Sequence, residues 1–132
     1  MGYGSYMDVA NELGERELVR ITNLDGESPV QLKVQIAIDF ADILIDTYIR
    51  GRYILPLSGP SPGILRKISK DLAINYLYEG AYAKSAMPNT IVWKKIDAMK
   101  LLLGIQSGDI ILQNQERMPS FVITNSKQNV NK

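Results

Sequence analysis

Residues 30–48 read VQLKVQIAIDFADILIDTY, and this stretch decides the fold because its apolar residues recur mostly at every third or fourth position. Such spacing is typical of an amphipathic helix, here of about five turns, and we expect it to form the central helix of the core. The side chains predicted to face the core are Leu32, Ile36, Phe40, Ile43, Leu44 and Tyr48. The carboxylates of Asp39, Asp42 and Asp46 interleave with them and are expected on the opposite, solvated side.

Helical patterns also flank this stretch on both sides. Residues 8–13 and 15–21 predict two short helices separated by Gly14, with Ser5 as an N-cap. Residues 64–78 predict a long helix, and a further one begins at Pro88 and ends at Gly104. Their predicted core residues are Ile64, Leu65, Ile68, Leu72, Tyr76 and Leu77, then Val92, Trp93, Ile96, Met99, Leu102 and Leu103. The chain is therefore predicted to be all-α: a small helical bundle over residues 1–104, with an N-terminal helical hairpin and three longer helices.

The pattern changes over residues 105–132. Two short β-prone runs, at residues 109–112 and 120–124, are separated by a polar stretch that contains Pro119. An isolated two-stranded hairpin is marginally stable in water. We therefore expect an extended or β-hairpin C-terminal tail that serves as a docking arm, held in place by a partner.

The composition narrows the chemistry that this chain can perform. Its 132 residues include no Cys and no His, which excludes thiolate nucleophiles, disulfides, Cys/His zinc sites and any triad with an imidazole base. No apolar run approaches the roughly 18 residues that a membrane span needs, so no membrane partner is expected. No nucleotide-binding glycine motif is present either. We expect neither a cofactor nor an enzymatic activity.

One loop has oxygen ligands at alternate positions, as a calcium site would. Asn23, Asp25 and Glu27 could begin an EF-hand, but the motif then needs Gly at position 28 and Glu at position 34, where this chain has Ser and Val. The three aspartates of residues 30–48 lack a second acidic cluster to complete a site. No metal site is predicted.

Charge is distributed unevenly along the chain. Residues 1–46 contain nine acids and three bases, a net charge of −6, whereas the remaining residues contain twelve bases and five acids, a net charge of +7. Such asymmetry points to contacts with partners. The basic side chains of Arg50 and Arg52, next to Tyr53, and those on the two later helices leave two hypotheses open: contact with acidic surfaces of other copies, or contact with nucleic-acid phosphates.

A series of short signatures resembles one known family. The order is Tyr6-x-Asp8, Gly14-Glu-x-Glu17-Leu18, a loop over residues 22–26, and then Ile45-Asp46-x-Tyr48-Ile49-x-Gly51-Arg52-Tyr53-x-Leu55-Pro56-Leu57. Over about residues 3–104 the chain is similar to the Mu-like phage neck proteins, a family of head-tail joining proteins. The resemblance implies a virion structural protein: a connector, or adaptor, that forms a homo-oligomeric ring beneath the portal. It would be assembled in the host cytoplasm and would contact the portal protein, the next neck or tail protein and, without sequence preference, the exiting DNA.

These expectations assign candidate residues to two contacts. The predicted subunit interface comprises Asp39, Asp42, Asp46, Arg50, Arg52, Tyr53, Arg66 and Lys67. The predicted portal-docking tail comprises Ile110, Ile111, Leu112, Phe121, Val122 and Ile123. The alternative is a small helical DNA-binding protein of phage packaging or regulation, which would use the basic side chains of the two later helices.

Overall fold

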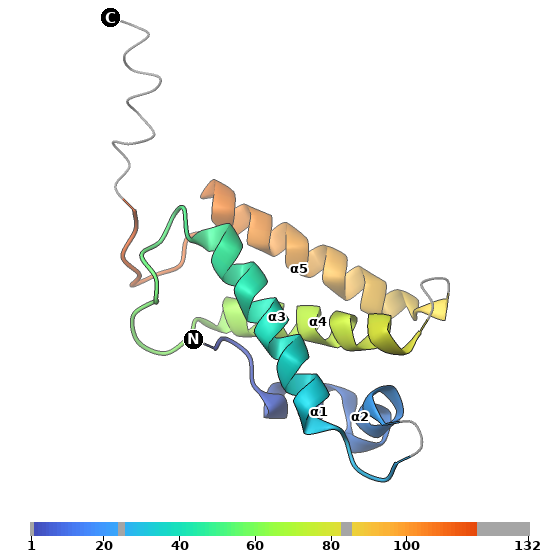
Figure 1. Cartoon of the computed structure of the whole chain (residues 1–132). Helices are drawn as coiled ribbons and strands as arrows, with labels where there is room; N and C mark the ends of the chain where they lie inside the picture. The colour runs from blue at the N-terminus through green and yellow to red at the C-terminus, as the bar shows by residue number, and fades with distance from the viewer. Residues whose placement is uncertain (1, 24–25, 83–85, 119–132) are drawn as a thin grey trace, which may run out of the picture.

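Five helices make up the fold in a computed structural model that describes residues 2–23, 26–82 and 86–118 (Figure 1). They are α1 (Tyr6–Leu13), α2 (Glu15–Thr22), α3 (Gln31–Ile49), α4 (Gly63–Ala81) and α5 (Asn89–Ser107). No strand occurs within these described ranges, so the all-α prediction is confirmed for them. None of the helices found there is long and apolar enough to cross a membrane.

The three long helices form the body of the molecule, and the two short ones cover one end of it. Helix α4 packs against both α3 and α5, while α1 and α2 form a hairpin beside α3 and α4 (Figure 1). The predicted N-terminal hairpin is thus confirmed. Ser5 caps α1, because its side chain accepts a hydrogen bond from the Asp8 N–H at 3.2 Å. Gly14 separates α1 from α2 with φ +82°, a backbone conformation that glycine adopts readily.

The predicted core face of α3 is wrong for four of its six residues. Leu32, Ile36, Phe40 and Ile43 are 47–69% exposed, and Leu44 and Tyr48 are half-buried. The buried face instead comprises Val34, Ala37, Ile38, Ala41, Asp42, Ile45 and Ile49. The small residues Ala37 and Ala41 are both fully buried in the face that packs against the rest of the bundle. The helix is apolar on both sides, so apolar spacing alone did not identify the inner one.

Two of the long helices differ in how well their inward faces were predicted. On α4, Leu65, Ile68, Leu72 and Leu77 are buried as expected. On α5 only Leu102 and the half-buried Met99 agree, since the core is filled by Ile91, Ala98, Leu102 and Ile105. The other predicted core residues of α5 are exposed: Val92 (37%), Trp93 (62%), Ile96 (39%) and Leu103 (48%).

The aromatic residues of the core also differ from the prediction. Tyr76 is 37% exposed and Trp93 lies largely in solvent. The tyrosines that are buried are Tyr3, Tyr53 and Tyr78, which come from the N-terminal segment, the loop after α3 and helix α4. Each of the three hydroxyls makes a hydrogen bond, which allows a tyrosine to be buried without leaving a polar group unsatisfied.

The end of α5 lies three residues beyond the predicted stop. Gly104 remains helical, and Gly108 ends the helix in a left-handed conformation with φ +94°. The backbone N–H of Ile110 donates to the Gly104 carbonyl at 3.0 Å, so the chain folds back over the last turn. A glycine suits this place, because a Cβ at position 104 would lie 2.8 Å from the Ile110 side chain.

The segment after α5 packs onto the bundle. Leu112 is 3% exposed and belongs to the core, and the pair Tyr53 and Arg117 forms an isolated antiparallel bridge. No strand is assigned to residues 109–112, and the run expected to pair with them, residues 120–124, lies outside the described residues. The hairpin therefore stays a prediction. The predicted boundary between bundle and tail at residues 104 and 105 stays a prediction.

Candidate interaction surfaces

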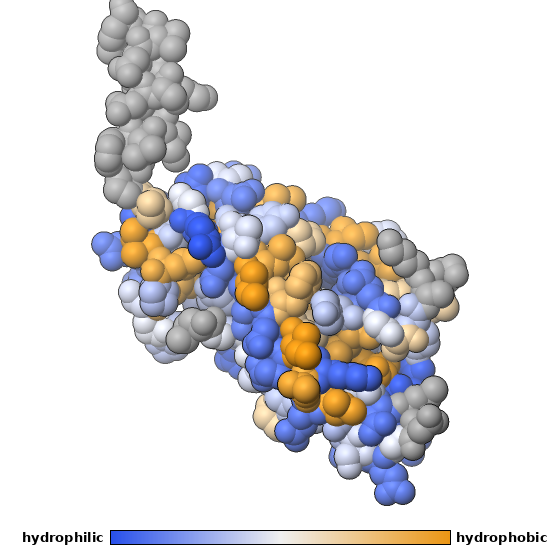
Figure 2. All heavy atoms as spheres, in the orientation of Figure 1, coloured by the Kyte–Doolittle hydropathy of each residue, from blue (hydrophilic) through white to orange (hydrophobic). Residues whose placement is uncertain are grey.

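The first candidate surface is the outward face of α3. We call Leu32, Ile36, Phe40 and Ile43 the α3 stripe; they lie at helical spacing and are all exposed. Figure 2 shows hydrophobic atoms along the course of this helix on the side toward the viewer. Exposed apolar residues are ordinary when they are scattered, but a continuous row marks a contact surface.

A cavity of about 250 Å³ lies beside the α3 stripe, between α2, α3 and α4. It is lined by Ile21, Lys33, Ile36, Tyr76, Leu77 and Gly80, so its wall is mostly apolar with one ammonium group. Next to it, the rings of Phe40 and Tyr76 pack with their centroids 5.0 Å apart. We call this hollow the α2–α4 cavity.

The second apolar surface is on α5. Val92, Ile96 and Leu103 recur at helical spacing and, with Trp93, form what we call the α5 stripe. Trp93 is the single tryptophan of the chain and has 62% of its surface exposed. Tryptophan is strongly enriched among the residues that dominate protein interfaces.

The aspartates of the predicted subunit interface have different environments. Asp42 is 7% exposed, which corrects its predicted place on the solvated side of α3. Its carboxylate accepts hydrogen bonds from the Tyr3 N–H at 3.2 Å and the Ser69 hydroxyl at 2.8 Å. Burial raises the pKa of Asp42, and these hydrogen bonds only partly offset it. Asp42 therefore fixes the N-terminal segment and α4 to α3.

Asp39 and Asp46 lie on either side of this buried group. Asp46 accepts a hydrogen bond from the Tyr3 hydroxyl, whose pKa is raised chiefly by burial and then by this carboxylate. Among the described residues Asp46 forms no ion pair with Arg50, although their spacing suits one. Asp39 is exposed and accepts a hydrogen bond from the Gln35 amide at 2.9 Å. Of the three aspartates, Asp39 is the most accessible to another molecule.

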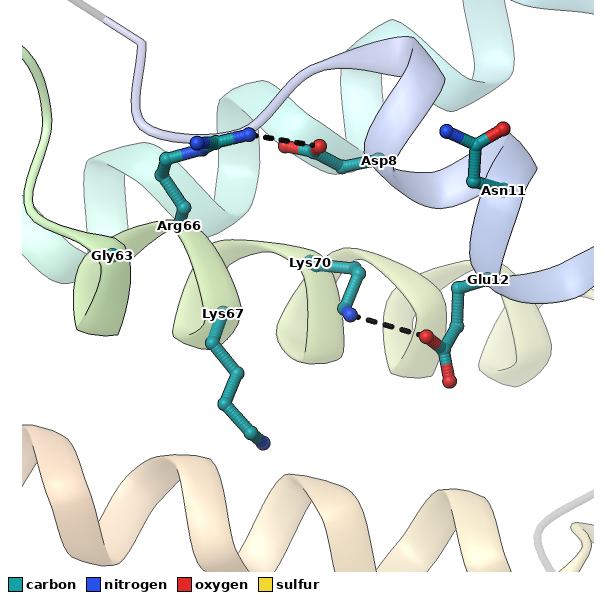
Figure 3. Close-up of a pocket in the computed structure, with 7 residues that line it drawn as sticks. All are labelled: Asp8, Asn11, Glu12, Gly63, Arg66, Lys67 and Lys70. Carbon is teal, nitrogen blue, oxygen red and sulfur yellow. Dashed lines mark hydrogen bonds and ion pairs between the residues drawn. The ribbon is translucent and has the colours of Figure 1, made fainter.

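The acidic and basic halves of the sequence meet within one chain. Asp8 and Glu12 on α1 face α4 across a cavity of about 340 Å³, where Arg66 pairs with Asp8 at 3.2 Å and Lys70 with Glu12 at 3.1 Å (Figure 3). Lys94 of α5 also pairs with Glu12, at 2.5 Å. The hydrogen bonds from Lys94 and Lys70 lower the pKa of Glu12 to about 2. Part of the charge asymmetry thus serves the fold of the single chain.

Of the four predicted basic interface residues, Lys67 and Arg52, like Arg66, are engaged by their own chain. Lys67 points away from α1 in Figure 3 and pairs with the buried Asp71 at 2.8 Å. The Arg52 guanidinium donates to the Gln106 carbonyl at 2.8 Å, and Tyr53 is buried. Arg50 is exposed at the C-terminal end of α3.

The described part of the predicted docking tail is mostly bound to the bundle. Leu112 is buried, Ile110 is half-buried over Gly104, and Ile111 is 52% exposed. The Gln115 side chain fixes the loop before α4 through two hydrogen bonds, from the Ser58 N–H at 2.8 Å and to the Ser58 carbonyl at 3.0 Å. The other predicted tail residues, Phe121, Val122 and Ile123, lie outside the described residues.

Two features of these surfaces could not be predicted from the sequence. The role of Tyr3 is one, because its contacts with Asp42 and Asp46 span about forty positions and leave no local pattern. The α2–α4 cavity is another, since three separate elements create it. In the described part of the chain, no three Asp or Glu side chains are grouped so that they could hold a metal ion.

Taken together, the fold and the surfaces define a small all-α protein with two outward helix faces that are apolar. The chain belongs to the family described as Bacteriophage Mu, Gp36, whose model matches residues 3–127. A search of curated proteins finds no match. The resemblance to a Mu phage family is thereby confirmed, and the match extends past residue 104 to include all six residues of the predicted docking tail.

Proposed function

We propose that this phage protein is a non-enzymatic connector subunit of the virion neck, which forms a ring beneath the portal and joins it to the next neck or tail protein. The observation that carries the proposal is the pair of exposed apolar surfaces, the α3 and α5 stripes. Membership of a Mu phage family supports a place for the chain among phage components. Exposed apolar rows of this kind are typical of proteins that function by binding other proteins.

A ring requires two different surfaces on each subunit. In a cyclic ring one patch of each copy meets another patch of the next copy, which is a heterologous interface. The two stripes offer two candidate patches, one on α3 and one on α5. The charge contrast between the two halves of the sequence is weaker support for contacts between copies, because Asp8 and Glu12 pair with bases of their own chain.

The rival hypothesis of a DNA-binding protein receives less support from the geometry. Five of the six basic side chains on which it depended are paired with carboxylates of the same chain: Arg66, Lys67, Lys70, Lys94 and Lys95. A base that is paired with a carboxylate adds less net positive charge to the surface that would attract phosphates. We therefore propose only non-specific contact with the DNA that passes through the ring.

We propose that the C-terminal residues Phe121, Val122 and Ile123 dock on the portal protein. Residues 116–118 run antiparallel to residues 52–54, with hydrogen bonds of 2.8 Å from Ile54 N–H to the Glu116 carbonyl and from Met118 N–H to the Arg52 carbonyl. Residues 116–118 thus already pair with the backbone of another segment, and extended segments commonly bind partners by adding a strand. The family match to residue 127 supports a shared role for this segment.

Genetic removal of the chain tests this function. A phage that lacks it is expected to make DNA-filled heads and separate tails, and the purified chain added to such a lysate should restore joined particles. A variant with Phe121, Val122 and Ile123 each replaced by Ser should keep the helix content of the parent and fail to restore joining. Normal particles from the deletion phage would overturn the proposal.

A further inference from the structure

The structure contains a hollow and a protruding side chain of matching chemistry, placed on different helices. The hollow is the α2–α4 cavity, and the protruding side chain is Trp93 of the α5 stripe. We infer that Trp93 of one copy inserts into the α2–α4 cavity of the next copy, and that this insertion forms the heterologous contact of the ring. The inference rests on the proposed connector function, which supplies the second copy.

The size and lining of the cavity favour a single large side chain. Its volume of about 250 Å³ is below the roughly 300–1,000 Å³ of typical small-molecule sites. Ile21, Ile36 and Leu77 give it apolar walls, and the ring of Tyr76 gives it an aromatic one. An aromatic side chain buried in such a hollow contributes both apolar area and ring packing.

Within one chain the cavity and Trp93 remain apart. The cavity is formed by α2, α3 and α4 alone, whereas Trp93 is on α5 and keeps 62% of its surface exposed. Both features are therefore available to other molecules. The cavity offers an apolar binding site, and the tryptophan offers a large side chain to fill one. A contact of this kind is heterologous, because one copy contributes Trp93 and the other copy contributes the cavity.

Charge at the rims of the two features is complementary. Lys33 lines the cavity, and Asp97 is one helical turn after Trp93, where it shares the same side of α5. Both side chains are exposed, and neither takes part in an ion pair among the described residues. When Trp93 enters the cavity of a second copy, Asp97 is carried toward the Lys33 ammonium group. This complementarity favours a second copy of the chain as the occupant.

Two variants separate the two halves of the contact. Trp93→Ala removes the inserted side chain and keeps the cavity. Gly80→Leu fills the cavity and keeps the tryptophan; a Cβ at position 80 meets nothing within 4 Å, and leucine is a better helix former than glycine, so this variant is expected to fold. Leu103→Ala, on the same stripe as Trp93, is the matched control.

The decisive experiment measures association by native mass spectrometry, for the purified full chain alone and mixed with the purified portal protein of the same phage. The wild type and Leu103→Ala should form oligomers in at least one of these samples, and each of the two test variants alone should not. An equimolar mixture of Trp93→Ala and Gly80→Leu should form dimers, because one supplies the tryptophan and the other the cavity. Fluorescence from the single tryptophan should shift to shorter wavelength in the oligomers that form without portal.

Several results would overturn the inference. One is that Trp93→Ala assembles to the wild-type extent while Gly80→Leu does not assemble. That result would mean that another side chain, such as Phe121, occupies the cavity. Others are assembly of both variants, a mixture that stays monomeric, or a wild type that is monomeric in both samples. If the wild-type chain still joins heads to tails in the lysate assay, the connector function stands and only this contact is wrong.

Discussion

The backbone N–H of Leu112 donates a hydrogen bond of 2.8 Å to the hydroxyl of Tyr53, a residue 59 positions earlier in the chain. Tyr53 is 1% exposed and Leu112 is 3% exposed, so this bond lies inside the core. It connects the segment after α5 to the loop after α3, two segments that sequence analysis treated as separate. The residues just beyond α5 therefore contribute to the stability of the bundle.

Leu112→Ala is expected to lower the free energy of unfolding by about 2–4 kcal/mol, because it deletes buried methyl groups and leaves a cavity. Urea unfolding followed by circular dichroism measures the change. The matched control is Ile111→Ala, at a position that is 52% exposed, which should change stability by less than about 0.5 kcal/mol. Equal effects of the two substitutions would contradict the burial of Leu112.

Gly4→Ala is expected to destabilise the fold by about 1–3 kcal/mol. A Cβ at position 4 would lie 2.4 Å from the Ser69 hydroxyl, so the hydroxyl would have to move and its hydrogen bond to buried Asp42 would be lost. Gly80→Ala is the control, since a Cβ there meets nothing within 4 Å and helix propensity favours alanine by up to about 1 kcal/mol. Thermal unfolding should show the two substitutions moving the midpoint in opposite directions.

The ion pairs of Glu12 predict a dependence of stability on pH. Lys94 and Lys70 lower the pKa of Glu12 from 4.5 to about 2 in the folded chain. A lowered folded pKa means that the carboxylate stabilises the fold above the unfolded pKa and that this contribution is lost as the pH falls toward 2. Glu12 is partly exposed, so solvent screening limits the contribution to about 1 kcal/mol.

Glu12→Gln removes this contribution and provides the comparison. The wild type should be more stable than the variant at pH 7, and the difference should vanish as the pH approaches 2. Unfolding by urea at a series of pH values measures both curves. A constant difference over the whole range would show that the ion pairs of Glu12 do not stabilise the fold.

Substitutions in the α3 stripe are expected to weaken assembly while leaving the stability of the fold nearly unchanged. Leu32→Ser combined with Ile43→Ser should change the free energy of unfolding by less than about 1 kcal/mol, because both side chains are at least 65% exposed, and should weaken assembly with the portal. Met7→Ser provides a control, at an exposed apolar position on α1 outside both stripes. Loss of assembly by the control as well would show that any serine at an exposed apolar position weakens assembly, and would contradict a specific role of the α3 stripe.

The positions of the helices could be predicted from sequence, whereas their inward faces could be predicted only in part. Apolar spacing and the glycine between the two short helices located all five helices. On α3, however, both sides carry large aliphatic residues, and the side facing α4 contains the alanines at 37 and 41 together with a buried aspartate. The contacts that satisfy Asp42 come from Tyr3 and Ser69, which are 39 and 27 positions away. No local pattern contains that information.

The candidate surfaces, too, could be predicted from the sequence only in part. The sequence predicts that the chain acts by binding other proteins, and it predicts a subunit interface made mostly of charged residues. The structure pairs several of these internally, such as Arg66 with Asp8. Apolar spacing along α5 predicts Trp93 in the core. The structure exposes it, and that exposure gives the chain a surface suited to a neighbouring copy.

Electron microscopy of the purified portal protein mixed with this chain tests the central claim most directly. The connector account predicts an additional ring of density on one face of the portal, and predicts that fewer portal particles carry it with the Leu32→Ser, Ile43→Ser variant. Portal particles that remain without added density at saturating concentrations of the chain would contradict the account.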